Sequence, residues 1–393
     1  MYDLIIVGAG IAGLRVGIET LKKGVKCTIL EKYNYVGGRV TTFKKFIPGF
    51  GHVQWENGAG RISITHKKVL KLFAQYGLTF VPHSGKTGFA GQNTMGQNVI
   101  GQNTFTELIK VYIEPLEKLD PSILATHTLG ELFHKTGVPP FYLQFPYYSE
   151  IHVLRADIAI HSFKSEMKSN EGFGSCKEGL SALADAMQNE FISLGGEIIF
   201  GMEVVRVTKN TLYCYKDKPV IYTPKNIVLA LHSSALKRIK GIRAPVLRYL
   251  RMEPLLRIYA VFKTPVHIGR IVTASPIRNI IPITPHIVMI SYTDGDDCRF
   301  WKNKGENAVM AELRKIVDVP DPIFFKMHYW ADGCTYWLPG KYNVEEESYK
   351  SLQIAENVFL CGESYAVNQC WIESALDQAD KLLSLEGFSK NHI

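Results

Sequence analysis

The sequence lacks long apolar runs and long runs of like charge. No apolar stretch in its 393 residues approaches the roughly 20 residues needed to cross a bilayer, and the run at 4–7 is too short for a secretion signal. The formal net charge of +8 is spread over short clusters such as Lys44–Lys45, which is typical of a solvated surface. We therefore expect a soluble, cytoplasmic protein that binds neither membranes nor nucleic acid.

Cysteine is too scattered for a disulfide framework or a zinc site. The seven cysteines stand at positions 27, 176, 214, 298, 334, 361 and 370, without paired short spacing. The acidic segment SYTDGDD, residues 291–297, is more typical of a turn than of metal ligands. We expect reduced thiols and no metal site.

Composition and length indicate a folded protein of two or three domains. Hydrophobic residues make up 46% of the chain and aromatic residues 11%, which disfavours long disorder. Nothing in the sequence separates a monomer from a homodimer.

The amino-terminal residues predict a nucleotide site. DLIIV, residues 3–7, reads as a buried strand, and GAGIAG follows it at once before an apolar-periodic helix. Gly8 permits a sharp turn, Gly10 lets the backbone approach a pyrophosphate, and Gly13 lets the helix pack close to the strand. The phosphate would lie against the N–H groups of the helix start, which include Ile11 and Ala12.

A second predicted strand ends in an acid. Glu31, followed by Lys32, can accept hydrogen bonds from the ribose hydroxyls of an adenosine. Beyond it, Arg39 follows the glycine pair that ends at Gly38, so its guanidinium can reach a phosphate. The segment WENGAGRI supplies another close-approach turn at Gly58–Gly60, which includes Ala59. These features alone do not separate FAD from NAD.

The carboxyl-terminal segment makes the prediction specific. NVFLCGESYAVNQCWIESALDQADKLL, residues 357–383, reads as a strand, a Gly-Glu turn, a loop and a helix. Together with the amino-terminal motifs, this order closely resembles the flavin-containing amine oxidases, which include monoamine, polyamine and L-amino-acid oxidases. The resemblance implies bound FAD. It places Gly362 and Glu363 on the diphosphate and ribityl region, and the helix start with Trp371, Ile372 and Ala375 under the flavin ring.

Two segments in the middle of the chain also resemble the family pattern, and they complete the expected architecture. Residues 172–187 resemble the family's helix returning to the FAD domain, and Val204, or its neighbour Val205, would contact adenine through its backbone. The expected fold is α/β: a discontinuous Rossmann-like FAD-binding domain of the glutathione reductase type, joined to a smaller α+β substrate domain with a mixed sheet. We assign residues 1–65, 172–245 and 331–393 to the former, and 66–171 and 246–330 to the latter.

The repeated GQN triplets of residues 91–105 carry no inferred chemistry. We interpret this segment as a loop or a strand-and-turn surface, with a substrate-entry flap as the alternative.

Two positions depart from the family pattern. Arg257 stands where relatives place a Lys near the flavin's reactive nitrogen, which brings dioxygen reactivity into question. In the aromatic cage that flanks the amine, Trp371 matches one wall. Thr335 occupies the usual place of the other, where Tyr336 or Trp337 would have to substitute.

Two further residues have open roles. Cys334 matches the cysteine that monoamine oxidases bond to the flavin, although a free thiol and non-covalent FAD are the favoured interpretation. Arg61 resembles the carboxylate-binding Arg of L-amino-acid oxidases, with a structural or FAD-phosphate role as the alternative.

The resemblance implies an FAD-dependent oxidoreductase that oxidises the C–N bond of a small amine or amino acid to an imine. Dioxygen would reoxidise the flavin and give hydrogen peroxide. The alternatives are a flavoprotein of the same fold with a lapsed site and a structural or binding role, or a dehydrogenase that uses another acceptor.

Overall fold

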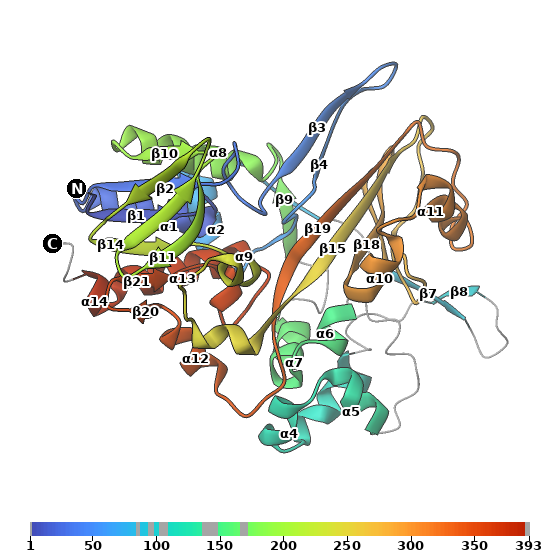
Figure 1. Ribbon diagram of the computed structural model, residues 1–393. Helices are drawn as coiled ribbons and strands as arrows, with labels where there is room; N and C mark the ends of the chain where they lie inside the picture. Colours follow the sequence, from blue (N-terminus) through green and yellow to red (C-terminus); the bar gives the residue numbers. More distant parts are fainter. Residues whose placement is uncertain are drawn as a thin grey trace.

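Two sheets dominate the computed structural model (Figure 1). Within the described residues, a six-stranded and a seven-stranded sheet are accompanied by three smaller ones. The structure describes residues 2–83, 87–92, 98–101, 109–135, 148–165 and 172–389.

The six-stranded sheet gathers strands from both ends and the middle of the chain. Its first five strands are parallel and the sixth is antiparallel to its neighbour. In spatial order they are β10 (Glu197–Phe200), β2 (Cys27–Glu31), β1 (Leu4–Val7), β14 (Asn226–Leu229), β21 (Val358–Leu360) and β20 (Gln353–Ala355). The predicted strands near both termini therefore belong to one parallel sheet, where β14 lies between β1 and β21.

The helix that follows β1 joins the two ends of the chain. Helix α1 (Ile11–Lys22) packs beside α13 (Ile372–Ser384), and the Nε of Arg15 pairs with Asp380 at 3.0 Å. Apolar side chains of α1 and α13 share one buried cluster with the inner strands. Full burial of one such aliphatic side chain contributes about 1.5–3 kcal/mol. Packing of this kind brings the amino-terminal and carboxyl-terminal motifs together.

Two further helices cover this unit. Helix α8 (Ser181–Ser193) is the predicted helix of the 172–187 segment, and it packs on α1. Helix α2 (Lys67–Tyr76), at the start of the stretch that we assigned to the substrate domain, packs against α13 and α8. The smaller elements nearby are α9 (Ser233–Arg238), α12 (Val344–Lys350), α14 (Glu386–Ser389), β11 (Glu203–Thr208), β12 (Thr211–Tyr215) and β13 (Pro219–Tyr222).

The seven-stranded sheet forms the other half of the molecule (Figure 1). It is mixed, because β16 and β7 run parallel while the other neighbours are antiparallel. Its order is β19 (Phe324–Trp337), β15 (Leu250–Val261), β18 (Ile287–Asp294), β17 (Asn279–Thr284), β16 (Arg270–Thr273), β7 (Thr87–Gln92) and β8 (Asn98–Gly101). The mixed sheet expected beside the nucleotide-binding unit is confirmed.

Short helices and small sheets complete the described chain. The helices are α4 (Pro121–Thr126), α5 (Leu129–Lys135), α6 (Tyr148–His152), α7 (Ala156–Ser165), α10 (Gly295–Trp301) and α11 (Glu306–Leu313), with single helical turns at Ile109–Ile113, Glu114–Lys118, Pro245–Tyr249 and Glu363–Tyr365. The small sheets contain β3 (Thr42–Ile47) with β4 (Gly51–Glu56), and β5 (Ile62–Ser63) with β9 (Phe173–Cys176) and β6 (Phe80–Pro82).

Two segments interpreted from the sequence, SYTDGDD and the GQN repeats, can be compared with the observed elements. The segment SYTDGDD is the end of β18 running directly into α10, with Gly295 at a φ of 55° where they join. The GQN segment lies partly outside the described residues, and its described parts belong to β7 and β8. No helix in the described ranges is long and apolar enough to span a membrane.

Candidate functional site

A single cavity of about 1320 Å³ lies between the two sheets and receives residues from both. It exceeds the roughly 300–1,000 Å³ typical of small-molecule sites. Its wall includes every cofactor-binding and catalytic candidate from the sequence except Gly13: Gly8, Gly10, Ile11, Ala12, Glu31, Lys32, Gly38, Arg39, Gly58, Ala59, Arg61, Val204, Arg257, Tyr336, Gly362, Glu363, Trp371, Ile372 and Ala375.

The three glycines of the segment GAGIAG, after β1, differ in their surroundings. Gly8 has a φ of 105°, and a Cβ there would lie 2.6 Å from the carbonyl oxygen of Ala230. A Cβ on Gly13 would lie 2.1 Å from the carbonyl oxygen of Gly8, so this glycine serves close packing of α1. A Cβ on Gly10 would meet no atom within 4 Å, because it would project into the cavity. The turn therefore leaves space for a ligand at Gly10.

The start of α1 offers backbone donors at the same place. Gly10 caps this helix without any side-chain hydrogen bond. The first N–H groups of a helix have no partner within the helix, and together with the helix dipole they attract a phosphate.

Glu31 ends β2 at the cavity with its carboxylate held by the backbone. Its Oε2 accepts from the N–H of Ala9 at 2.7 Å, and its Oε1 accepts from the N–H of Tyr33 at 2.8 Å. Each oxygen keeps a second lone pair for a ribose hydroxyl. The adjacent Lys32 forms an ion pair with Glu203 at 2.7 Å.

The two valine candidates for the adenine contact lie next to each other on β11. The strand pairing is irregular between Val204 and Arg206, and both Val204 and Val205 line the cavity. The carbonyl oxygen of Val205 already accepts from the N–H of Lys240 at 3.0 Å. Val204, which is registered with Cys214, and Val205, at the irregularity, therefore both remain candidates for the adenine contact.

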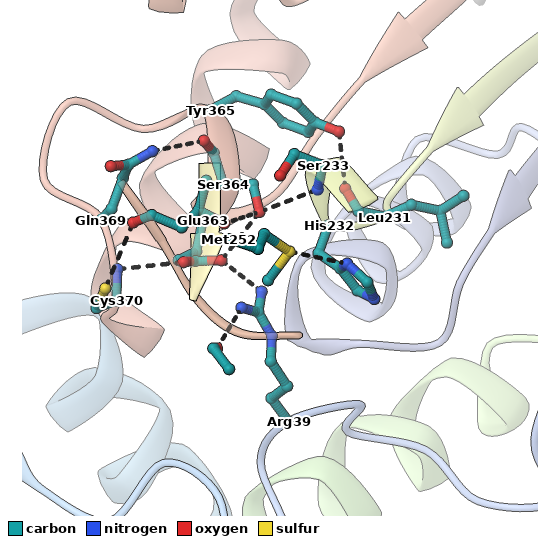
Figure 2. A network of polar contacts seen from close by, with 12 residues as sticks. Arg39, Leu231, His232, Ser233, Met252, Glu363, Ser364, Tyr365, Gln369 and Cys370 are labelled. Carbon is teal, nitrogen blue, oxygen red and sulfur yellow. Dashed lines mark hydrogen bonds and ion pairs between the residues drawn. The ribbon is translucent and has the colours of Figure 1, made fainter. Parts of the chain in front are cut away.

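Arg39 and Glu363 connect the two ends of the chain across the cavity wall (Figure 2). The Arg39 guanidinium pairs with the Glu363 carboxylate and also donates to the carbonyl oxygen of Gly333 at 2.9 Å. Glu363 accepts further from the N–H of Cys370 at 3.2 Å and lies beside the hydroxyl of Ser364. The sequence analysis placed each of the paired residues on the cofactor, and the structure brings them together.

The aromatic ring of Trp371 belongs to a stacked group. Trp371 precedes α13 as its N-cap, and its ring stacks with Phe173 at 6.0 Å and meets the edge of His66 at 4.9 Å between centroids. The guanidinium carbon of Arg61 lies 4.5 Å from the Phe173 ring centre and 5.4 Å from that of Trp371. Arg61 is thus supported by two ring faces at the cavity wall.

Strand alternation decides which residues of CTYW face the cavity. Cys334 and Tyr336 line it, since successive side chains of β19 point to opposite faces. The Thr335 hydroxyl instead contacts that of Ser364 at 2.7 Å, and the Trp337 Nε1 donates to the carbonyl oxygen of Ala366 at 2.9 Å. Of the two aromatic substitutes for Thr335, the structure therefore presents Tyr336.

Arg257 occupies the predicted position on β15 as a buried cation. Its side chain is 8% exposed, and its Nη1 donates to the carbonyl oxygen of Glu56 at 3.2 Å. The guanidinium carbon lies 4.8 Å from the centre of the Tyr292 ring. Within the described part of the chain, the buried Nε of Arg257 has no hydrogen-bond partner.

A residue that the sequence analysis missed is Glu150 on α6. Its side chain is 5% exposed and lines the cavity, and the Tyr336 hydroxyl lies 3.5 Å from its Oε1. Its Oε2 has no hydrogen-bond partner among the described residues. Burial, together with the nearby Asp294, raises the pKa of Glu150 well above its ordinary value. No motif signalled this residue, because an isolated glutamate in YSEIH is typical of an exposed helix.

Glu373, in the segment WIESA of residues 371–375, holds a neighbouring helix in place, whereas Trp371, Ile372 and Ala375 line the cavity. Glu373 accepts from the N–H groups of Lys68 and Val69, both at 2.9 Å, at the start of α2. The carboxylate therefore caps that helix and ties it to α13.

These observations fit an FAD molecule. The space at Gly10, the uncapped start of α1 and the carboxylate of Glu31 suit a diphosphate and a ribose. Gly38 and Gly362, both with positive φ, leave further space, since a Cβ on either would meet a backbone atom only at 3.8 Å or more. Groups of three or more His, Cys, Asp or Glu side chains able to hold a metal ion are not found within the described residues.

Comparison with solved structures supports the fold. A putrescine oxidase variant redesigned in its cofactor binding has a TM-score of 0.76 at 15% identity, over 96% of this chain and 97% of that chain. A double mutant from the same redesign has a TM-score of 0.75 at 14% identity, over 98% and 99% of the two chains. Wild-type putrescine oxidase bound to putrescine gives 0.75 at 14%, over 96% and 97%. At these identities the likeness shows the fold alone.

The family follows from the sequence match. No curated protein matches the chain. The family model described as flavin containing amine oxidoreductase matches residues 11–381, which span almost the whole chain. The chain therefore belongs to the flavin-containing amine oxidoreductase family.

Proposed function

We propose that this protein binds FAD and oxidises the C–N bond of a small amine or amino acid to an imine, with dioxygen as the electron acceptor and hydrogen peroxide as a product. The observation that carries the proposal is the continuous cavity, which joins Gly10 and Glu31 to Trp371, Tyr336 and Arg257. When bound, FAD supplies the two-electron redox chemistry. The chain's own residues then have to bind, orient and desolvate the substrate.

Two buried polar side chains suit a cationic or zwitterionic substrate. Glu150 and Arg257 both line the cavity, so the Glu150 carboxyl group can accept a hydrogen bond from an ammonium group and the Arg257 guanidinium can donate one to a carboxylate. Arg61 is an alternative carboxylate partner, although its guanidinium is already stacked on Phe173 and Trp371.

Aromatic side chains shape the reacting end of the cavity. Trp371 and Tyr336 both line it, from the start of α13 and from β19. Tyr336 is held by its contact with Glu150, and burial raises the pKa of its hydroxyl, which keeps it neutral. We propose that these two rings orient the amine and keep water away from it.

The test is an anaerobic spectral screen of the purified protein. It should be yellow, lose its flavin absorbance with at least one substrate, and release peroxide when air is admitted. Amines should be screened beside the amino acids that share their side chains, because this pairing separates the Glu150 and Arg257 contributions. A flavin that no compound of a broad panel reduces would exclude the proposal.

A second candidate is a dehydrogenase that passes electrons to another acceptor, and Arg257 is the observation that favours it. The guanidinium keeps its proton at physiological pH and fills the place of the usual Lys. Protein reduced by substrate would then transfer electrons to an artificial dye much faster than to air. Comparing the two reoxidation rates on the same sample separates the candidates.

A further inference from the structure

Two thiols stand apart from the other cysteines of the chain. Cys334 on β19 and Cys370, immediately before Trp371, are half-buried and line the cavity. The other five cysteines are buried: Cys27, Cys176, Cys214, Cys298 and Cys361. Burial raises the pKa of each of these five thiols, which makes them poor nucleophiles.

The two cavity thiols are direct neighbours. The Cys370 Sγ lies 3.6 Å from the carbonyl oxygen of Thr335, the residue after Cys334, and the two thiols are close enough to interact. Cys370 has a φ of 71°, in the left-handed region that residues other than glycine rarely adopt. Backbone of this kind persists where the surroundings hold it, and here it directs the thiol toward β19.

The charges around the pair give the two sulfurs different roles. The Arg39 guanidinium and Glu150 are each close enough to interact with both thiols, whereas Glu363 interacts with Cys370. The neighbouring Cys334 thiol and then burial raise the pKa of the Cys370 thiol well above its ordinary value. The Glu363 carboxylate, which accepts from the N–H of Cys370 at 3.2 Å, disfavours a second negative charge there, so the first attack on an external sulfur is assigned to Cys334.

We propose that Cys334 and Cys370 are a redox-active pair that interconverts between dithiol and disulfide on the cavity wall, by exchange with a small-molecule disulfide. The Cys334 thiolate attacks one sulfur of the disulfide, forming a mixed disulfide and releasing the first small thiol. The Cys370 thiol then gives its proton to the small thiolate released in the first step, and its sulfur attacks Cys334, forming the internal S–S bond and releasing the second small thiolate. In sum, two protein thiols are oxidised and one small disulfide is reduced to two thiols.

The bond would join two elements that shape the reacting end of the cavity. Cys334 is two residues before Tyr336 on the same face of β19, and Cys370 adjoins Trp371. Oxidation would fix the spacing between these elements, and a disulfide at Cys334 is incompatible with covalent flavin attachment there. Formation of this disulfide requires neither an amine substrate nor catalytic turnover. The proposal of a redox-active pair can therefore be tested independently of the proposed function.

The test is a thiol count on the full-length protein as purified. Treatment with hydroxyethyl disulfide should lower the thiols titrated after denaturation from the seven of the sequence by two. The protein mass should fall by about 2 Da, with no retained adduct. Peptide mapping should link the peptides that contain Cys334 and Cys370, and dithiothreitol should restore the count.

Variants assign the roles. Cys370→Ser should retain a stable mixed disulfide at Cys334, whereas Cys334→Ser should acquire neither an adduct nor a cross-link. Cys214→Ala, in the buried core of the small sheet, is the matched control and should lose the same two thiols as the wild type. A full complement of thiols after treatment, a cross-link between other cysteines, or a flavin-sized mass addition at Cys334 would each overturn the pair.

Discussion

The two ends of the cavity are built by different means. At the end that we propose for the nucleotide, the contacts come from a glycine turn, from the start of α1 and from the Glu31 carboxylate, which the backbone N–H groups of Ala9 and Tyr33 hold in place. At the reacting end they come from buried side chains, namely Arg257, Glu150 and Tyr336. Backbone contacts depend on glycines at fixed spacing, whereas buried side chains depend on elements far apart in the sequence. The first end is therefore the more predictable.

The largest effect is expected from a methyl group at the nucleotide end. Gly10→Ala should weaken FAD binding about 100-fold, or about 2.7 kcal/mol, because the Cβ enters the space proposed for the pyrophosphate. The fold of the apoprotein should tolerate the change, since no atom lies within 4 Å of that Cβ. Fluorescence titration of the apoprotein with FAD measures the affinity.

Gly305→Ala is the matched control. Gly305 also caps a helix, with φ and ψ of −84° and 176° against −70° and 173° at Gly10, and its Cβ would likewise meet nothing within 4 Å. It directly precedes α11 and is not among the residues that line the cavity. Equal loss of FAD affinity in both variants would contradict the proposed place of the pyrophosphate.

At the reacting end, Glu150→Gln should raise the KM for amines about tenfold, or about 1.4 kcal/mol, because a bound ammonium group favours the ionised form of Glu150, and this carboxylate binds the ammonium group more strongly than an amide does. The flavin content should not change, since Glu150 lies on the substrate side in our proposal. Steady-state kinetics with the best amine of the screen measures the effect. An unchanged KM for every amine would remove Glu150 from the substrate site.

A pH-dependent effect is expected at Glu56, where β4 meets the cavity. Burial raises its pKa to about 7, so the native state holds the proton more tightly than the unfolded chain does. The stability that this provides is complete below the unfolded pKa near 4.5 and is lost as the pH rises through 7. Glu56→Gln should therefore gain stability relative to the wild type between pH 5 and pH 8, by about 1 kcal/mol at pH 8.

Thermal unfolding of both proteins across this pH range measures the Glu56 effect. Glu356→Gln, at an exposed glutamate, is the control. The difference in Tm between this variant and the wild type should stay the same across the pH range. A Glu56→Gln protein whose Tm tracks that of the wild type at every pH would show that Glu56 does not titrate in this way.

The smallest effect is expected from Arg257→Lys. This change restores the side chain that the family usually has at this position, so reoxidation of the reduced flavin by dioxygen should quicken about threefold, or about 0.6 kcal/mol. Stopped-flow mixing of photoreduced protein with air-saturated buffer measures the rate without any substrate. A slower reoxidation in the variant would show that Arg257 does not hold back the reaction with dioxygen, and it would remove the observation that favours the dehydrogenase alternative.

The predictability of the site follows from how local each signal is. Gly8, Gly10 and Glu31 were found because a strand, a tight turn and a helix leave a pattern in consecutive residues. The partnership of Arg39 with Glu363 was not foreseen, although each residue was singled out, because only packing of α1 on α13 brings them together. Glu150 carried no signal at all, since its burial results from the position of α6 beside β18 and β19.

The register of β19 gives a second case. The sequence left Tyr336 and Trp337 as equal substitutes in the aromatic cage, since both follow Thr335. The pairing of β19 with β15 decides that Tyr336 faces the cavity and that Trp337 is buried on the other side. A shift by one residue would have reversed the two.

Sequence alone determined the family, the parallel sheet and the position of the nucleotide turn, because these depend on short-range patterns of glycines and apolar residues. Only the tertiary structure decided which polar groups are buried together, which face of β19 meets the cavity, and that Cys334 and Cys370 line the same cavity as neighbours. The physical reason is that burial and contact are properties of the assembled core, in which residues distant along the chain become neighbours.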